Sequence, residues 1–229
     1  ELKAMFPKYL NSLKLKDKKG NVLSLDSDGN GNFKDFVKSY IIASAQKAMD
    51  KGTDLSQLTW ITINDNKVID VDMNAYVSNM GRLKTTSAFD KFDLSSGENS
   101  LFGTSTIDTQ HFTAYGQKNS TGSATMSDPK IIKMMNPMNY LGNTGATNAK
   151  YYYIRYGTAD SNTSISIPIV VGTKAQNLGY SVNMETPWEI CHRGDYNLEE
   201  MFDWMDNSVS DARMNPTVKA LNNKLTEIF

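Results

Sequence analysis

The last third of the sequence alternates strand-like with helix-like segments, and this alternation narrows the possible folds more than any other feature. The run Tyr151–Gly157 is rich in aromatic residues and is typical of a β-strand. The expected elements, in order, are a strand at 151–157, a helix at 164–178, a strand at 180–184, and helices at 198–209 and at about 217–228. A strand–helix–strand–helix order predicts a parallel sheet with helices outside it, which is the α/β class.

The segment 164–178 allows two interpretations. The alternation of Ile165, Ile167 and Ile169 would suit a strand, because alternate side chains of a strand point to the same face. The length of the segment, the stop at Gly179 and the place of Pro168 in the first turns favour a helix instead. We therefore expect a helix between the two strands.

The first two thirds of the chain are organised differently. The expected elements are helices at 4–15 and at about 33–48, and strands at 58–63 and 68–71. Residues 72–135 alternate short apolar patches with Ser, Thr, Gly and Asn, and no long periodic element stands out there. We interpret that stretch as a loop-rich domain, because its aromatic residues need burial.

The composition excludes several classes of function. The 24 Lys and Arg residues against 25 Asp and Glu give a net charge of −1, so the chain lacks the excess of basic residues that is typical of nucleic-acid-binding proteins. No apolar run approaches the ~18 residues of a membrane span. A single Cys excludes an internal disulfide framework, and two His residues exclude a His-rich metal cluster. We therefore expect neither a nucleic-acid partner nor a membrane partner.

Two polar loops follow the two expected strands, and each carries a residue suited to acid–base chemistry. Asp160 comes shortly after the first strand, and His192 lies in the loop after the second. In an open α/β sheet, ligands bind beyond the carboxyl ends of the strands, where these loops would meet. An acid followed one unit later by a histidine has the chain order of the α/β-hydrolase triad, Ser, then Asp or Glu, then His. In such a triad the histidine takes the proton of the nucleophile, and the carboxylate orients the imidazole and stabilises its charged form.

Each residue alone has a simpler explanation. An aspartate after a strand is more often a helix cap than a catalyst, and a loop histidine is usually just solvated. The order and the topology together favour Asp160 and His192 as catalytic residues. The other histidine, His111, follows no strand–helix unit, and we expect it to be packed or solvent-facing.

Several separated blocks of the sequence resemble the bacterial tannases and related carboxylesterases. The stretch 153–164, Tyr-Ile-Arg-Tyr-Gly-Thr-Ala-Asp-Ser-Asn-Thr-Ser, is similar to the segment of these enzymes that carries the catalytic acid. The stretch 187–198, Pro-Trp-Glu-Ile-Cys-His-Arg-Gly-Asp-Tyr-Asn-Leu, is similar to their histidine segment. Further similar blocks lie at 33–38, 88–90 and 98–104, so the likeness covers nearly the whole chain.

This resemblance implies an α/β-hydrolase with a large α+β lid domain inserted late in the sheet. Residues 1–136 would form the lid, and residues 137–229 would form the C-terminal part of the catalytic core, a parallel sheet flanked by helices. Asp160 and His192 would be the acid and the base of a Ser-His-Asp triad. No cofactor is required for this chemistry.

The resemblance also implies residues that recognise the substrate. In tannases a lysine and a glutamate of the lid, with an aspartate two places after the catalytic acid, hold the hydroxyls of the galloyl ring. Lys84 and Glu98 fall at the first two places, although a surface Lys–Glu pair would be the simpler explanation without the resemblance. The third place holds Asn162, which can bind a hydroxyl but carries no charge. The expected substrate is a small ester of a hydroxylated aromatic acid, galloyl or hydroxycinnamoyl.

The sequence contains no nucleophile elbow, G-x-S-x-G, which such a hydrolase requires. The nearest run, Gly-Thr-Ser-Thr-Ile at 103–107, lacks the second glycine and follows no strong strand. Cys191 is not a substitute, because adjacent side chains on a loop generally point apart. We expect the serine and the first strands of the sheet in a segment N-terminal to this chain, which would be its partner. The alternative is a non-catalytic binding module, or an inactive subunit, that retains the hydrolase fold.

The run 26–32, Asp-Ser-Asp-Gly-Asn-Gly-Asn, resembles the first half of an EF-hand loop. Asp26, Asp28 and Asn30 would supply oxygen ligands to Ca²⁺ at alternate positions. Val37 stands where such a loop is closed by a glutamate. A turn that caps the following helix explains the run better, and we favour it over a Ca²⁺ site.

Overall fold

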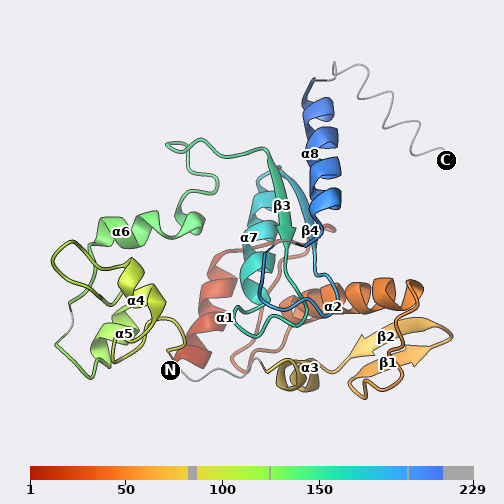
Figure 1. Cartoon of the computed structure of the whole chain (residues 1–229), viewed down its shortest axis with the longest axis horizontal. Helices are drawn as coiled ribbons and strands as arrows, with labels where there is room; N and C mark the ends of the chain where they lie inside the picture. Colours follow the sequence, from red (N-terminus) through yellow and green to blue (C-terminus); the bar gives the residue numbers. More distant parts are fainter. Residues whose placement is uncertain (82–86, 124, 195, 214–229) are drawn as a thin grey trace.

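A computed structural model describes residues 1–81, 87–123, 125–194 and 196–213 (Figure 1). The helices are α1 (Leu2–Ser12), α2 (Asn32–Asp50), α3 (Met73–Asn79), α4 (Gly97–Leu101), α5 (Ala114–Lys118), α6 (Pro129–Met134), the short 3-10 helix η1 (Pro137–Asn139), α7 (Ser166–Asn177) and α8 (Leu198–Arg213). The strands are β1 (Ile61–Asn64), β2 (Lys67–Val71), β3 (Tyr151–Arg155) and β4 (Ser181–Glu185). None of the described helices is long and apolar enough to cross a membrane. The helix expected at 217–228 and residue Lys84 lie outside the described residues.

β3 and β4 form a parallel pair, as the sequence predicts for an α/β fold. Their register pairs Tyr151 with Ser181 and Arg155 with Glu185. α7 connects the two strands and packs against both, which confirms the helix expected between them. A parallel pair needs such a crossover, because the chain must return to the starting end of the sheet before the second strand begins. Both strands therefore finish at the same edge, and the loops that follow them begin side by side (Figure 1).

β1 and β2 form an antiparallel hairpin that is closed by Asp65 and Asn66. Both residues have positive φ, 47° and 58°, which is the backbone of a type I′ turn and which Asp and Asn tolerate better than most residues. The hairpin packs against α2 through β2. There Lys38 of α2 forms an ion pair with Asp70 at 2.8 Å, so the hairpin is fixed to this helix.

One hydrophobic core is shared between segments that are far apart in the chain. Its N-terminal contribution comes from α1, α2, the hairpin and α3, where Leu10, Ile41 and Tyr76 are each 0% exposed. Its C-terminal contribution includes Tyr156 and, from α7, the fully buried Ile169. The core therefore draws residues from both sides of position 136, where the sequence predicts a domain boundary.

A side-chain clip adds to this long-range contact. The amide of Asn177, at the end of α7, accepts a hydrogen bond from Lys16 N at 2.7 Å and donates one to Lys16 O at 2.9 Å. The amide thus bonds to the backbone as a neighbouring strand would. It ties together two residues that are 161 positions apart in the sequence.

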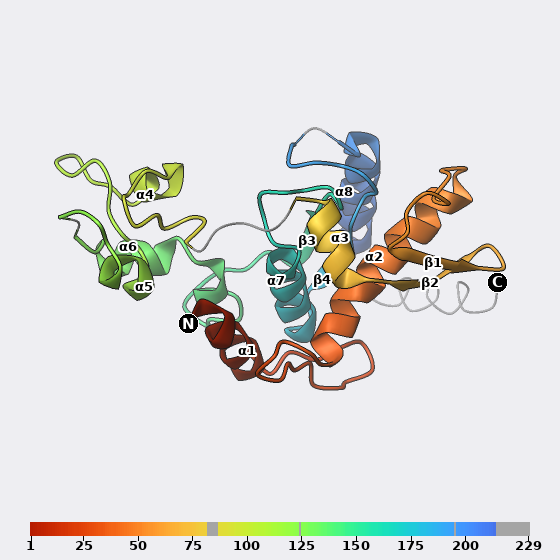
Figure 2. The ribbon, with the colours of Figure 1, turned by 90° about the horizontal axis from the view of Figure 1, so that it is seen from below.

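Residues 88–134 form a loop-rich group around α4, α5 and α6, which lies away from β3 and β4 in both views (Figures 1 and 2). The centre of this group is polar, because Asp90 is 5% exposed and His111 is 0% exposed. Asp90 Oδ1 lies 2.6 Å from His111 Nδ1 and accepts a hydrogen bond from Asn99 Nδ2 at 2.8 Å. Thr113 N donates to the other carboxylate oxygen at 2.8 Å. His111 is thus packed inside this group, one of the two placements that the sequence allows.

Candidate active site

Two loops leave the carboxyl ends of β3 and β4, and they carry the two residues that the sequence predicts to be catalytic. Asp160 lies in the first (residues 156–165, the Asp160 loop), and His192 lies in the second (residues 186–194, the His192 loop). Asp160 Oδ2 and His192 Nδ1 are 3.0 Å apart, which is hydrogen-bond distance. The parallel strand pair therefore brings together two side chains 32 positions apart, here named the Asp–His pair.

The two members of the Asp–His pair differ in exposure. The side chain of Asp160 is 8% exposed, whereas that of His192 is 56% exposed. Asp160 Oδ1 accepts hydrogen bonds from the backbone amides of Asn162 at 2.7 Å and Thr163 at 3.0 Å. Within the described residues no group bonds to His192 Nε2, so this nitrogen is open to proton exchange with a third group. A buried carboxylate that is held on one oxygen and bonded to an exposed imidazole on the other can orient a general base.

Burial and hydrogen bonding act on the pKa of Asp160 in opposite directions. Burial raises this pKa, because it removes water from the charged form. The hydrogen bonds from His192 and from the amides of Thr163 and Asn162 lower it by more. The net pKa lies below the ordinary aspartate value of 3.8, so the carboxylate is ionised at neutral pH and can stabilise an imidazolium.

Backbone hydrogen bonds join the two loops directly. Thr158 N donates to Pro187 O at 2.9 Å, and Ala159 N donates to Ile190 O at 3.0 Å. The closest approach is at Gly157, where a Cβ atom would lie only 2.0 Å from Ile190 O. Glycine therefore allows the two loops to pack backbone against backbone at this point.

An ion pair fixes the chain beyond the His192 loop to the acid-bearing strand. Arg155, the last residue of β3, pairs with Glu200 of α8. The guanidinium also lies over the ring of Tyr153, 3.7 Å from its centroid. Glu200 accepts a second hydrogen bond, at 3.0 Å, from the side-chain amide of Asn197, which immediately precedes α8. The return path of the chain into α8 is thus held against the end of β3.

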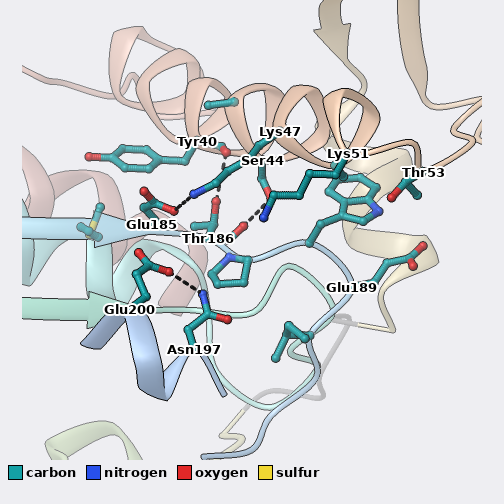
Figure 3. A pocket seen from close by; sticks show the side chains of 16 residues that line it. Tyr40, Ser44, Lys47, Lys51, Thr53, Glu185, Thr186, Glu189, Asn197 and Glu200 are labelled. Atoms are coloured by element: carbon teal, nitrogen blue, oxygen red, sulfur yellow. Dashed lines mark hydrogen bonds and ion pairs between the residues drawn. The ribbon is translucent and has the colours of Figure 1, made fainter. Parts of the chain in front are cut away.

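α2 holds the start of the His192 loop. Figure 3 shows Tyr40, Ser44 and Lys47 of α2 beside Glu185 and Thr186, where β4 ends. Ser44 Oγ donates to Thr186 O, Thr186 Oγ1 donates to Tyr40 O at 3.0 Å, and Lys47 pairs with Glu185 at 2.6 Å. These contacts border a cavity of about 530 Å³ that neither member of the Asp–His pair lines. The cavity lies beside the His192 loop and does not reach the predicted catalytic atoms.

The residues expected to recognise the substrate are not joined to one another by contacts within the described residues. Asn162 is exposed, two positions after Asp160, and lines a second cavity of about 550 Å³ between the Asp160 loop, α2 and α3. Glu98 is half-buried on α4, within the group of residues 88–134. Among the described residues, no hydrogen bond or ion pair joins Glu98 to either loop, and Lys84 lies outside the described residues. The structure thus joins the backbone of Asn162 to Asp160, whereas no contact within the described residues links Glu98 to the Asp–His pair.

No group of three or more His, Cys, Asp or Glu side chains that could hold a metal gathers in the part of the chain that the structure describes. In the run 26–32, Asp26 Oδ1 accepts hydrogen bonds from Asp28 N at 2.9 Å and from Asn30 N at 2.8 Å. An aspartate that bonds to the backbone two residues ahead forms an Asx turn. The structure thus has a turn at this run, but within the described residues no side chain of the run caps α2, whose N-cap residue is Gly31.

Together, the parallel strands and the hydrogen-bonded Asp–His pair define an α/β protein with a carboxylate and an imidazole joined beyond the carboxyl ends of its strands. No protein-family model and no curated protein matches the chain. Solved structures of bacterial tannases do match it. The native tannin acyl hydrolase from Lactobacillus plantarum is 43% identical, with a TM-score of 0.87, over 90% of this chain and 45% of that one. Tannin acyl hydrolase in complex with ethyl gallate is 43% identical, with a TM-score of 0.86, over 90% of this chain and 45% of that one.

A third structure extends the likeness to another organism. The Fusobacterium nucleatum tannase is 43% identical, with a TM-score of 0.82, over 90% of this chain and 45% of that one. The chain is therefore a relative of the bacterial tannases, in sequence as well as in fold. It spans less than half of the length of these solved structures.

Proposed function

We propose that the complete protein is a serine esterase that hydrolyses esters of hydroxylated aromatic acids, with galloyl esters as the first candidates. The observation that carries this proposal is the hydrogen bond between Asp160 and His192 in a chain 43% identical to tannases. Two of the similar structures were solved with related compounds, one with the ester ethyl gallate and one with the free hydroxylated aromatic acid 3,4-dihydroxybenzoate. A carboxylic ester hydrolase of this kind needs no cofactor for its chemistry.

In this proposal residues 137–229 belong to an α/β-hydrolase core, and residues 1–136 are a lid inserted into it. The parallel unit of β3, α7 and β4 supports the first assignment. The chain covers 45% of a similar tannase, so a longer protein has room for further strands. The order Ser, Asp, His along the chain puts the nucleophile before Asp160, in a segment N-terminal to this chain. No G-x-S-x-G occurs within the 229 residues, which agrees with that location.

His192 acts first as a general base. Its Nε2 takes the proton of the serine hydroxyl while the serine oxygen attacks the ester carbonyl carbon. The ionised carboxylate of Asp160 stabilises the resulting imidazolium through Nδ1, at the 3.0 Å contact described above. The product of this step is a tetrahedral intermediate with its negative charge on the former carbonyl oxygen.

His192 then acts as a general acid. It returns the proton to the leaving alcohol, and the carbon–oxygen bond to that alcohol breaks, which leaves an acyl-enzyme. A water molecule then attacks the acyl-enzyme: His192 accepts a proton from the water while the water oxygen bonds to the acyl carbon. His192 next returns that proton to the serine oxygen as the bond between this oxygen and the acyl carbon breaks, and the aromatic acid is released. The exposed Nε2 suits both steps, because solvent and substrate can reach it.

Lys84, Glu98 and Asn162 are the proposed contacts with the ring hydroxyls. Asn162 follows Asp160 so closely that a ring bound at its side chain lies next to the Asp–His pair. An amide offers weaker hydrogen bonds to phenols than the carboxylate that tannases carry at this place. We therefore expect the enzyme to hydrolyse hydroxycinnamoyl esters as well as galloyl esters.

The test uses the complete protein as its gene encodes it, with methyl gallate and methyl ferulate as substrates. We expect hydrolysis of methyl gallate, loss of that activity in His192→Ala, and labelling of one serine by a fluorophosphonate, located by mass spectrometry. Cys191→Ser is the matched control, because it changes the exposed neighbour of His192 and leaves the imidazole in place. Tight binding of methyl gallate without hydrolysis or serine labelling would favour the alternative, a non-catalytic binding module.

A further inference from the structure

We propose that Thr158 is a positioning residue, which holds the Asp160 loop and the His192 loop in the register that the Asp–His pair requires. The inference rests on the proposed esterase function for its kinetic consequences. Its structural basis is independent of that function, because it concerns contacts between the two loops and α3.

Thr158 is 0% exposed and forms hydrogen bonds to three residues in two other segments. Its backbone N donates to Pro187 O at 2.9 Å, and its hydroxyl oxygen accepts a hydrogen bond from Glu189 N at 2.7 Å. Its carbonyl oxygen accepts a hydrogen bond from the phenol of Tyr76 in α3 at 2.6 Å. One buried residue of the Asp160 loop therefore contacts both the His192 loop and the N-terminal part of the chain.

The hydroxyl of Thr158 meets the His192 loop at an unusual backbone conformation. Glu189 has a φ of 55°, in the left-handed region that residues other than glycine rarely adopt. Such a conformation persists only where its surroundings hold it. The hydrogen bond from Glu189 N to Thr158 Oγ1 is a contact that holds it, and it lies three residues before His192 in the chain.

The hydrogen bonds between the two loops lie just before Asp160 and His192 in the chain. Thr158 bonds to Pro187 and Glu189, and Ala159 bonds to Ile190, so the two loops run bonded together up to the Asp–His pair. Proton transfer depends on geometry at the level of fractions of an ångström. A slip of one loop against the other would lengthen the 3.0 Å contact that orients the imidazole.

Aromatic contacts also link the His192 loop to the N-terminal part of the chain. Tyr76, which is 0% exposed, packs against Trp60 with ring centroids 5.4 Å apart. Trp60 in turn stacks on Trp188 of the His192 loop, at 5.9 Å between centroids. Tyr76 and the two tryptophans thus brace Thr158 and the His192 loop together, and Tyr76 is the second residue through which the proposal can be tested.

The kinetic test compares three substitutions in the complete encoded protein. Thr158→Val keeps the shape of the side chain and removes the acceptor, whereas Thr158→Ser keeps the acceptor. Thr173→Val is the matched control, because Thr173 is 1% exposed and its hydroxyl has no hydrogen-bond partner within the described residues. With methyl gallate, we expect Thr158→Val to lower kcat about 10- to 100-fold, with KM changed less than about twofold. The other two variants should retain kcat within about threefold of the unsubstituted protein.

The spectroscopic test does not depend on turnover. The Nδ1–H proton of a histidine that is bonded to a carboxylate gives a low-field proton NMR signal, which weakens when the proton exchanges with water. We expect this signal of His192 to broaden or disappear in Thr158→Val and to persist in Thr158→Ser and Thr173→Val. If the unsubstituted protein cleaves no aromatic ester, the proposed function fails, and this signal still decides the role of Thr158.

The outcomes separate positioning from general stability. The proposal is wrong if Thr158→Val keeps both kcat and the His192 signal, or if Thr173→Val lowers both as much. If Thr158→Val does not fold, Tyr76→Phe decides, because it removes only the hydroxyl that bonds to Thr158 O. A lower kcat with unchanged KM in Tyr76→Phe supports the proposal, and an unchanged kcat overturns it.

Discussion

Asp90 and His111 form a buried pair, with 2.6 Å between Asp90 Oδ1 and His111 Nδ1. The same carboxylate accepts hydrogen bonds from Asn99 and Thr113, and a Cβ atom at Gly116 would lie 2.2 Å from its Oδ2. The helices around it are only five or six residues long, and helices of that length do not persist alone in water. The Asp90 carboxylate is therefore a central contact of this group of residues.

We expect Asp90→Asn to destabilise the group of residues 88–134 by about 2–4 kcal/mol, because an amide leaves buried donors unpaired. Urea denaturation followed by circular dichroism, with limited proteolysis inside this group, measures the effect. Asp93→Asn is the control, since Asp93 is exposed and accepts its hydrogen bonds, within the described residues, from Ser95, two positions along the chain. Equal stability losses in the two variants would contradict the central role of Asp90.

Acid should weaken the same group. Burial raises the pKa of Asp90, but hydrogen bonds from Thr113, His111 and Asn99 outweigh burial and bring the pKa below the ordinary 3.8. A carboxyl group with a lowered folded pKa stabilises the fold fully above its unfolded pKa, and this stability is lost as pH falls through the folded value. We expect the free energy of unfolding to fall as pH drops below about 3.8, and to fall less steeply in Asp90→Asn. Urea titrations from low to neutral pH measure the free energy of unfolding of both proteins. The prediction is wrong if this free energy depends on pH in the same way in Asp90→Asn and in the unsubstituted protein.

Asp160→Asn should reduce kcat for methyl gallate by a factor on the order of 10³ to 10⁴, with little change in KM. The amide cannot stabilise an imidazolium, and its N–H group favours the wrong tautomer of His192. Steady-state kinetics on the complete protein measure the loss. Asp203→Asn, on the exposed face of α8, provides the control and should behave like the unsubstituted protein. An Asp160→Asn variant with nearly full activity would remove Asp160 from the mechanism.

Gly157→Ala should separate the two loops, because the new Cβ would lie 2.0 Å from Ile190 O and backbone cannot easily move aside. We expect kcat to fall by more than about 100-fold, since the shift displaces His192 from Asp160. Gly122→Ala is the control, as its Cβ would meet no atom within 4 Å. Thermal unfolding and kinetics of both variants test the prediction, which fails if they behave alike.

Asn162→Asp should increase the preference for methyl gallate over methyl ferulate by about tenfold in kcat/KM. A carboxylate forms hydrogen bonds to phenols roughly twice as strong as those of an amide, and gallate offers more adjacent hydroxyls. Asn139→Asp, on η1 and outside both loops, adds the same charge and serves as the control. An unchanged ratio of the two substrates would show that the Asn162 side chain does not contact the ring.

The sequence allowed the Asp–His pair to be predicted because the elements around it are regular. Two strands and the helix between them have clear patterns, and parallel strands must end at one edge, so Asp160 and His192 had to approach each other. The short helices of residues 72–135 were harder to predict, because they are shorter than the window of about 11–18 residues in which a helical period can be recognised. Their starts were visible in principle, since Asp72, Ser96 and Thr113 each cap one with a side-chain oxygen.

The residues that hold the two loops could not be predicted, because their roles depend on contacts between distant segments. Thr158 reads as an ordinary loop residue until Tyr76 is placed against it, 82 positions away. Arg155 gave a weak signal as a charge inside an aromatic strand, but its partner Glu200 lies on a different element. Residue-by-residue patterns do not contain these pairings.

The clip between Asn177 and Lys16, with the core that residues such as Leu10 and Ile169 share, has a consequence for biosynthesis. A ribosome that adds about 5–20 residues per second exposes the N-terminal helices long before α7 emerges. Until then the part of their apolar surface that is shared with α7 and Tyr156 has no partner from this chain. The first 80 residues therefore complete this shared core only after α7 has been translated, and in that interval they expose apolar surface that a chaperone can bind.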